Sequence, residues 1–353
     1  MKILRARPLL GRPRVTVAIP CYNYGHYLPA AVASALDQPG VEVDVIVVDD
    51  CSSDGSREVA ADLAASDPRI TLVQHETNQG HIATFNDGVS RATGDYVVLM
   101  SADDQLAPGA LARAAALFEA RPEVALVYGV VSLFEHEPTG DDITMPHSWS
   151  VWSGPEWVQR TARRGRNIIF SPEAVLRTSV MHELGSYEAA HPHASDMMVW
   201  LRAAELGAVG RVNGPVHAYY REHGDNMHST MFAGVLTDLR HQRHVFDAFV
   251  TRSSLGTHDR QLVARRSNRA LAREAMLRAG VEQAGGAEQD VGAAVAFADF
   301  ALECDPGVRR TRRWSSYERR LRHGVSPAEA RLLRASFDLR WRLRWQRWAR
   351  FGT

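Results

Sequence analysis

The stretch VTVAIPCYNYGHYLPAAVASALDQPGVEVDVIVVDD, residues 15–50, decides the fold class. It begins and ends with short β-branched runs, and the intervening residues 26–37 are rich in alanine and leucine. Continuous apolar runs of this kind are typical of strands that are buried on both faces. The stretch therefore predicts a strand, a helix and a second, parallel strand joined by a right-handed crossover.

The same alternation continues along the first 134 residues. It is typical of an α/β fold with a Rossmann-like, mostly parallel, doubly wound sheet, in which ligands bind at the carboxyl ends of the strands. We expect strands at 15–19, 43–48, 70–73, 96–100 and 124–134, and helices at 26–37, 54–65, 80–91 and 108–120. Further along, we expect a helix at 195–206, a strand at 215–220 and a largely helical region at 230–300.

Charge is distributed unevenly along the 353 residues. The formal net charge is zero, yet residues 309–353 contain 14 arginines and only three acids, which gives this tail a charge of +11. Because the chain is longer than one ordinary core, we expect a principal domain with an appendage. The tail is predicted to be electrostatically distinct from the rest of the chain.

The cysteines and the N-terminal residues indicate the cellular compartment of the protein. Cys21, Cys51 and Cys304 form no CxxC pair, which favours a reducing compartment over a zinc site or a disulfide framework. The first 20 residues lack the apolar run of a signal peptide, and no later run approaches the length of a bilayer span. We therefore expect a cytoplasmic protein that is either soluble or attached peripherally to the inner face of the cell membrane.

Two nucleotide-binding signatures are absent. The chain has neither GxGxxG at the first helix nor GxxxxGK[ST], which disfavours a dehydrogenase or a P-loop NTPase. Instead, residues 20–23 after the first strand offer backbone groups and the amide side chain of Asn23 to a ligand. Asp49 and Asp50 follow the second strand. A carboxylate there suits the imide N–H of uracil or thymine, or a ribose hydroxyl, because it only accepts hydrogen bonds. The alternative is an ordinary turn and helix cap.

Asp103 and Asp104 form another acidic pair, after the strand at 96–100. Carboxylate oxygens favour Mg²⁺ or Mn²⁺, and one or two suffice when diphosphate and water complete the coordination. Ser101 stands where an Asp-x-Asp metal clamp would begin. The alternative is that the pair caps the helix that starts near Pro108.

Two polar positions lie downstream. Asp196 opens the helix at 195–206, and taken alone it is explained as a capping acid. Residues 221–226, REHGDN, follow a predicted strand and on their own fit an ordinary loop.

Five ordered motifs nevertheless resemble those of family 2 glycosyltransferases with the GT-A fold. They lie within residues 13–230 and read VTVAIPCYNYGHYLPAAVASALDQ, DVIVVDDCSSDGS, GDYVVLMSADDQLAPGAL, GSYEAAHPHASDMMVWLRAAELG and YYREHGDNMHS. The resemblance implies an inverting enzyme that moves a sugar from a nucleotide-diphosphate donor, with a UDP- or dTDP-sugar favoured, to an acceptor hydroxyl. It also implies Mn²⁺ or Mg²⁺ as a cofactor.

The resemblance implies roles for individual residues. Asp196 matches the catalytic base, and Ser195 stands where many members have Glu. Asp103 and Asp104 match the residues that hold the ribose and the metal-diphosphate, and His223 matches a residue near the metal or the diphosphate. The remaining candidates for nucleotide-sugar binding are Pro20, Tyr22, Asn23, Asp49, Asp50, His81 and Arg221.

Aromatic residues suggest two further surfaces. On the acceptor side we expect Trp149, Trp152 and Trp157, because aromatic faces stack on sugar rings, with a place in the core as the equal alternative. The tail places an aromatic stripe on one helical face, bordered by arginines, which fits an interfacial helix on anionic lipid over 331–351. The stripe consists of Leu333, Phe337, Trp341, Trp345 and Trp348. The alternatives are packing on the chain's own domain and a homodimer contact; no nucleic-acid partner is expected.

The predicted organisation has three parts: a GT-A catalytic domain at 1–230, a helical extension at 231–308 and an Arg/Trp-rich basic tail at 309–353. The catalytic domain contains a nucleotide-sugar half at about 13–130 and an acceptor half at about 131–230. The expected partners are the donor and a glycan or lipid-linked acceptor. Two rivals are a non-catalytic GT-A module that binds a nucleotide sugar or a partner, and a nucleotidyltransferase. A nucleotidyltransferase normally has a basic, Gly-rich loop after the first strand, where this chain has CYNYGHYLP.

Overall fold

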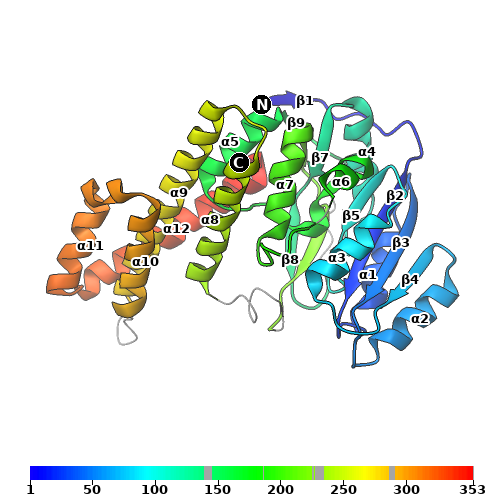
Figure 1. The fold of residues 1–353 in the computed structure, drawn as a ribbon, viewed down its shortest axis with the longest axis horizontal. Coiled ribbons are helices and arrows are strands. Elements are labelled where there is room, and N and C mark those ends of the chain that lie inside the picture. The colour runs from blue at the N-terminus through cyan, green and yellow to red at the C-terminus, as the bar shows by residue number, and fades with distance from the viewer. Residues whose placement is uncertain (139–144, 186, 225, 227–233, 286–290, 353) are drawn as a thin grey trace. The chain divides into compact units, whose positions relative to one another are not determined.

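The computed structural model describes residues 1–352 apart from 139–144, 186, 225, 227–233 and 286–290 (Figure 1). Asp225 and residues 227–229 of the last motif therefore lie outside the described residues. The chain divides into two compact units, Met1–Trp157 with Ile168–Thr230 and Val158–Asn167 with Met231–Thr353. Residues 158–167, which lie within the region expected to form the acceptor half, are grouped with the second unit.

A large mixed sheet forms the centre of the first unit. Within the described residues it has nine strands in the order β1-β9-β11-β7-β10-β5-β2-β3-β4. β2 pairs in parallel with β3 and β5, and β3 pairs in parallel with β4, which confirms the predicted α/β fold. The strands are β1 (Lys2–Leu4), β2 (Arg14–Cys21), β3 (Glu42–Asp49), β4 (Ile70–Gln74), β5 (Tyr96–Leu99), β7 (Val124–Tyr128), β9 (Ser148–Trp152), β10 (Val175–Arg177) and β11 (Ala208–Asn213).

The run at 124–134, which was expected to be one strand, forms two strands in different sheets. β7 joins the large sheet, whereas β8 (Val131–Phe134) pairs in parallel with β12 (Ala218–Arg221) in a small sheet completed by β6 (Gln105–Leu106). The break lies at Gly129, where a Cβ would lie 2.2 Å from His217 Cγ, so the backbone passes His217 more closely than any side chain allows. In the small sheet, β12, which ends at Arg221, lies beside β6, which directly follows Asp104.

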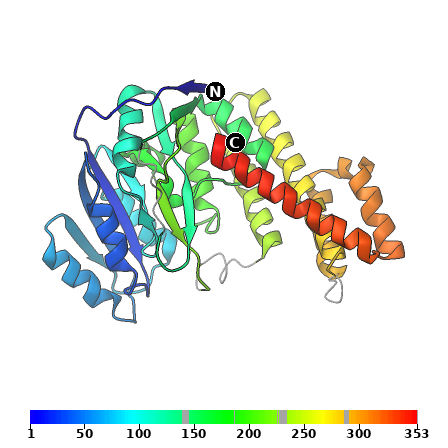
Figure 2. The same ribbon diagram turned by 180° about the vertical axis from the view of Figure 1, so that it is seen from behind.

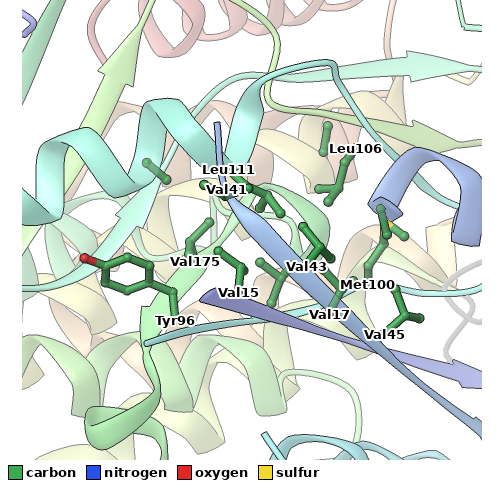
Figure 3. Close-up of a cluster of buried hydrophobic side chains, with 14 of the residues drawn as sticks. Val15, Val17, Val41, Val43, Val45, Tyr96, Met100, Leu106, Leu111 and Val175 are labelled. Carbon is green, nitrogen blue, oxygen red and sulfur yellow. The ribbon is translucent and has the colours of Figure 1, made fainter. Parts of the chain in front are cut away.

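Helices cover both faces of the parallel strands. α1 (Leu28–Leu36) and α4 (Ala110–Ala120) pack on the face that carries Val15 and Val17, in the cluster of Figure 3. α3 (His81–Ser90) packs on the other face, where Gly88 lies against Ala18. The remaining helices of this unit are α2 (Ser56–Ser66), α6 (Thr178–Leu184) and α7 (Ser195–Leu206), and α5 (Gly154–Arg164) extends from it into the second unit.

The three tryptophans proposed for acceptor stacking lie in the core. Trp149 and Trp152 are on β9, and Trp157 is on α5; all three are at most 2% exposed. Trp149 belongs to the hydrophobic core cluster that contains Val15 and Val17, and the ring of Trp152 stacks on that of Tyr128 with 6.3 Å between the ring centres. The prediction that these tryptophans stack on an acceptor sugar is therefore wrong, and the alternative of a core position is correct.

The second unit is helical within the described residues. Its helices are α8 (Val235–Arg252), α9 (Thr257–Gln283), α10 (Val291–Cys304), α11 (Arg312–His323) and α12 (Pro327–Phe351). α12, the red helix of Figure 2, packs along α9. Within the described ranges, no helix combines the length and the apolar character that a bilayer crossing requires.

The predicted aromatic stripe of the tail is not the free face of α12. Phe337 lies under the guanidinium of Arg278, 4.5 Å from the ring centre, and Trp348 is buried. Phe337 and Trp348 are therefore covered and do not form the lipid contact that was predicted for the stripe, whereas Trp341 and Trp345 are 45% and 39% exposed.

Candidate active site

The loops that follow β2 and β3 interlock at the carboxyl edge of the sheet. The Asn23 N–H donates to Ser52 Oγ at 3.0 Å, and the Ser53 N–H donates to Asn23 Oδ1 at 2.9 Å. Asn23 and Cys51 both adopt positive φ, near 60°, a conformation that disfavours most side chains. Such strained positions cluster at functional sites because the surrounding structure enforces them.

Pro20 and Tyr22 lie beside this junction. Pro20 is tolerated inside a strand because the pairing of β2 with β5 ends at Ala18, so no partner strand needs its missing N–H. Tyr22 is 49% exposed, which leaves an aromatic face open at the strand ends. Asp49 is buried; its Oδ2 accepts from the Ser52 N–H at 3.2 Å, and within the described residues its Oδ1 has no hydrogen-bond partner.

Asp50 holds a loop inside the protein. It is 2% exposed, its Oδ1 accepts from the Gln79 N–H at 2.8 Å, and its Oδ2 accepts from the Gly80 N–H at 2.9 Å. His75 Nδ1 lies 2.8 Å from the same Oδ1, and His75 Nε2 lies 3.2 Å from Asp87 Oδ2. These contacts use most of the accepting capacity of Asp50, so in this structure the carboxylate orders residues 79 and 80.

His75 is held between two carboxylates, and this arrangement changes three pKa values. Burial by itself lowers the pKa of His75, but the hydrogen bonds to Asp50 and Asp87 outweigh it and raise the pKa above its usual value. Burial by itself raises the pKa of Asp50 and of Asp87, and their hydrogen bonds outweigh it and lower both. The trio therefore favours an imidazolium between two carboxylates.

Asp103 and Asp104 lie in the turn after β5. The turn closes through a hydrogen bond from the Asp104 N–H to the Ser101 carbonyl at 3.1 Å, and both acids are buried. Asp104 Oδ1 accepts from the Arg221 N–H at 3.0 Å, and Asp103 Oδ2 lies 3.0 Å from His223 Nε2. The expected meeting of the two acids with Arg221 and His223 is thus present in the structure.

Arg221 supports the turn and does not extend into an open site. Its Nε donates to the Asp103 carbonyl at 3.1 Å, and its Nη1 donates to the carbonyls of residues 135 and 136 at 2.9 and 2.8 Å. Its guanidinium also stacks between Tyr27 and Phe134, at 4.5 and 4.3 Å from the ring centres. A nucleotide sugar would therefore compete with these internal contacts for the guanidinium of Arg221.

The acid pair suits a divalent cation. Burial raises the pKa of Asp103, and burial together with the charge of Asp103 raises the pKa of Asp104 well above its usual value. Within the described residues, Asp103 Oδ1 has no hydrogen-bond partner, so a buried hard oxygen lacks a counterpart. The described residues contain no group of three or more ligating side chains, so water and diphosphate would complete the coordination of a cation.

Asp196 lies in the first turn of α7, where the helix dipole favours a carboxylate. Its Oδ1 accepts from the Met197 N–H at 2.6 Å. The segment before α7 is tied to α3: His81 Nε2 lies 3.0 Å from the Pro192 carbonyl, and Asn86 exchanges two hydrogen bonds with the backbone of Tyr187. The predicted nucleotide residue His81 therefore positions the segment that leads to Asp196.

Several residues of this region were not predicted from the sequence. His75 and Asn86 connect the strand-end loops to the segment before α7, and Asn226 Nδ2 lies 3.4 Å from Asp103 Oδ2. His75 directly follows β4, so the rule that ligands lie at strand ends could have identified it. Asn86 and Asn226 carry no such signal, because their partners are more than 100 residues away in the sequence.

Comparison with known proteins shows a similarity to glycosyltransferases. Residues 16–174 match the family model described as glycosyl transferase family 2. The chain is 28% identical over 222 residues to an uncharacterized glycosyltransferase of Nostoc sp., covering 61% of this chain and 66% of that protein. It is 38% identical over 101 residues to the succinoglycan biosynthesis protein ExoO of Rhizobium meliloti, covering 29% of this chain and 28% of that protein. The chain thus spans less than two thirds of the length of these curated relatives.

Two solved structures share the fold. The mannosyltransferase PcManGT from Pyrobaculum calidifontis, in complex with GDP-Man and Mn²⁺, has a TM-score of 0.56 at 18% identity, covering 95% of this chain and 89% of that one. S. aureus TarS 1–349, in complex with UDP-GlcNAc, has a TM-score of 0.57 at 16% identity, covering 84% of this chain and 92% of that one. At these identities the likeness concerns the fold alone.

Proposed function

We propose that the chain, whose residues 16–174 match the model of glycosyl transferase family 2, transfers a sugar from a nucleotide-diphosphate donor to an acceptor hydroxyl with inversion. The observation that carries the proposal is the acid pair Asp103 and Asp104, which is buried at the carboxyl edge of the parallel strands. Ligands of such sheets bind at this edge. Asp103 Oδ1, which has no partner within the described residues, supports a role in binding a cation with the donor.

In this proposal Asp196 is the catalytic base. Inversion needs one displacement at the anomeric carbon, so a single carboxylate that removes the proton of the acceptor hydroxyl suffices, and no covalent nucleophile is required. A positioned general base contributes about 10²- to 10⁴-fold to the rate. The hydrogen bonds of His81 and Asn86 to residues 192 and 187 would hold the base segment relative to the donor loops.

The donor loops have separate tasks. Tyr22 offers an exposed ring to the nucleoside, while Pro20, Asn23 and Asp49 shape the junction beneath it. Asp103 and Asp104 would hold Mn²⁺ or Mg²⁺, and His223, which lies against Asp103, would approach the cation or the diphosphate. When bound, such a cation stabilises the negative charge that develops on the departing diphosphate.

The structure does not favour one nucleobase in the donor over the others. The resemblance favours UDP- or dTDP-sugars, but Asp50, the acid expected to accept from their imide N–H, is engaged with Gln79, Gly80 and His75. The similar folds hold UDP-GlcNAc in TarS and GDP-Man in PcManGT, so both donors belong in the panel. For the acceptor we propose a glycan or a lipid-linked saccharide at the inner face of the cell membrane, because ExoO acts in succinoglycan biosynthesis.

The experiment measures nucleotide diphosphate released from a panel of UDP-, dTDP- and GDP-sugars, with and without Mn²⁺. We expect metal-dependent release, which Asp196→Asn lowers by at least about 100-fold while donor binding measured by calorimetry is unchanged. The control variant is Asp62→Asn, an exposed acid on α2, which should behave as the parent. Donor binding without turnover, and without an effect of Asp196→Asn, would instead establish the non-catalytic binding module. Absence of both binding and turnover with every donor would refute the proposal.

A further inference from the structure

One face of α12 is anchored within the second unit. Arg344 Nη1 pairs with Glu274 Oε2 of α9 at 2.6 Å, and Phe337 packs under Arg278 of the same helix. Trp341 lies under Arg166, whose guanidinium carbon is 5.3 Å from the ring centre. These contacts determine which way the helix is turned about its axis.

The opposite face carries a row of leucines. Leu332, Leu339 and Leu343 are 70%, 58% and 55% exposed. Their spacings of seven and four place them within about 40° of one another around the helix. Exposed single leucines are ordinary, but these three form one stripe along the helix, with the exposed Ser336 between Leu332 and Leu339.

Arginines border this stripe on both sides. Arg331 and Arg342 fall on one side of the leucines and Arg340 and Arg347 on the other, and all four are exposed. Leucines between arginines on a helix that lies along a surface are typical of a helix that rests in the headgroup region of a bilayer. There the leucines enter the acyl boundary, while the long arginine side chains keep their charges among the phosphates.

The net charge indicates which lipid surface would fit. Residues 309–353 carry a charge of +11, which anionic headgroups would attract and zwitterionic ones would not. We propose that the leucine face of α12, formed by Leu332, Leu339 and Leu343 with the four flanking arginines, docks on a bilayer surface that contains anionic lipid. This contact is independent of catalysis and goes beyond the proposed transfer reaction.

The test is flotation of the full chain with vesicles of phosphatidylcholine, alone or mixed with phosphatidylglycerol. We expect binding to the mixed vesicles only, weakened by salt because surface charges are screened. Replacing the three leucines together by glutamine should weaken binding at least about tenfold, and removing Arg340 or Arg347 about fivefold each. The matched control replaces three exposed leucines of the first unit, Leu10, Leu133 and Leu206, by glutamine.

Three outcomes would overturn the proposal. The first is equal binding to both kinds of vesicle, or no binding to either. The second is equal loss of binding in the leucine variant and in the control variant. The third is a change from dimer to monomer in the leucine variant during gel filtration, which would show that a second copy of the chain covers this face. Because the leucines are exposed, the variants should unfold at the same temperature as the parent.

Discussion

Replacing His75 by leucine tests the buried charge network that holds the start of α3. The substitution keeps a side chain of similar size but removes the contacts to Asp50 at 2.8 Å and to Asp87 at 3.2 Å. A hydrogen bond to a charged group contributes about 1.5–3 kcal/mol, and Asp50 keeps two backbone donors, so we expect a loss of about 2–4 kcal/mol. For a unit of this size, that lowers the unfolding midpoint by about 4–16 °C.

The loss should depend on pH in a defined direction. The pKa of His75 is raised above 6.5 in the folded state, so its contribution is fully present below pH 6.5 and disappears as the pH rises through the folded value. The pKa values of Asp50 and Asp87 are lowered below 3.8, so their contributions are present above that pH and disappear as the pH falls. The difference between parent and His75→Leu should therefore be largest between about pH 4 and 6.5.

The assay is urea unfolding of parent and variant across pH, followed by far-ultraviolet circular dichroism. The control is His258→Leu, an exposed histidine on α9, which should change stability by less than about 0.5 kcal/mol. A stability difference that stays constant from pH 5 to pH 9 would refute the reasoning, since it would mean that His75 is not an imidazolium between two carboxylates.

Further predictions concern packing, a buried acid and the turn at the site. Gly154→Ala should destabilise the protein by at least about 2 kcal/mol in urea unfolding, because the new Cβ would lie 1.6 Å from the Ala204 carbonyl oxygen. Gly256→Ala, with no neighbour within 4 Å, should change stability by less than about 0.5 kcal/mol; equal effects would contradict the packing. Burial raises the pKa of Glu173 to about 8, so its contribution falls as the pH rises from about 4.5 to about 8, and Glu173→Gln should remove that part of the pH dependence. Arg221→Lys should lower both the unfolding midpoint and metal-stimulated turnover, because lysine cannot stack between two rings and donate to three carbonyls; unchanged turnover would show that the turn does not need it.

The strands and helices of the first 130 residues follow from local patterns. Apolar runs such as 43–48 are long enough for a buried strand and too short for a helix, and the structure has β3 at Glu42–Asp49. The same pattern places Asp49 and Asp103 at strand ends, and parallel strands bring their ends to one edge. This much of the site is therefore predictable from the sequence.

The tryptophans and the tail show where local patterns fail. Trp149 is an aromatic residue in a stretch that reads as irregular, and it is buried because it joins a hydrophobic cluster with residues from distant parts of the chain, such as Leu117 and Val212. The aromatic stripe of α12 has the expected helical period, but Phe337 and Trp348 are covered within the second unit. A helical period gives the direction of each side chain around the axis, but it does not say which face meets the rest of the protein.

The sequence by itself determined the fold class, the resemblance to family 2 glycosyltransferases and the positions of the candidate acids, because these depend on residue types at short spacings. Only the tertiary structure decided which acids keep a free oxygen. Asp50 and Asp103 follow strands in the same way, yet Asp50 is bound by two backbone N–H groups and His75, whereas Asp103 has a buried oxygen without a partner in the described residues. The reason is physical: a carboxylate's remaining capacity depends on donors such as His223, 120 residues away, that only folding brings within hydrogen-bond distance.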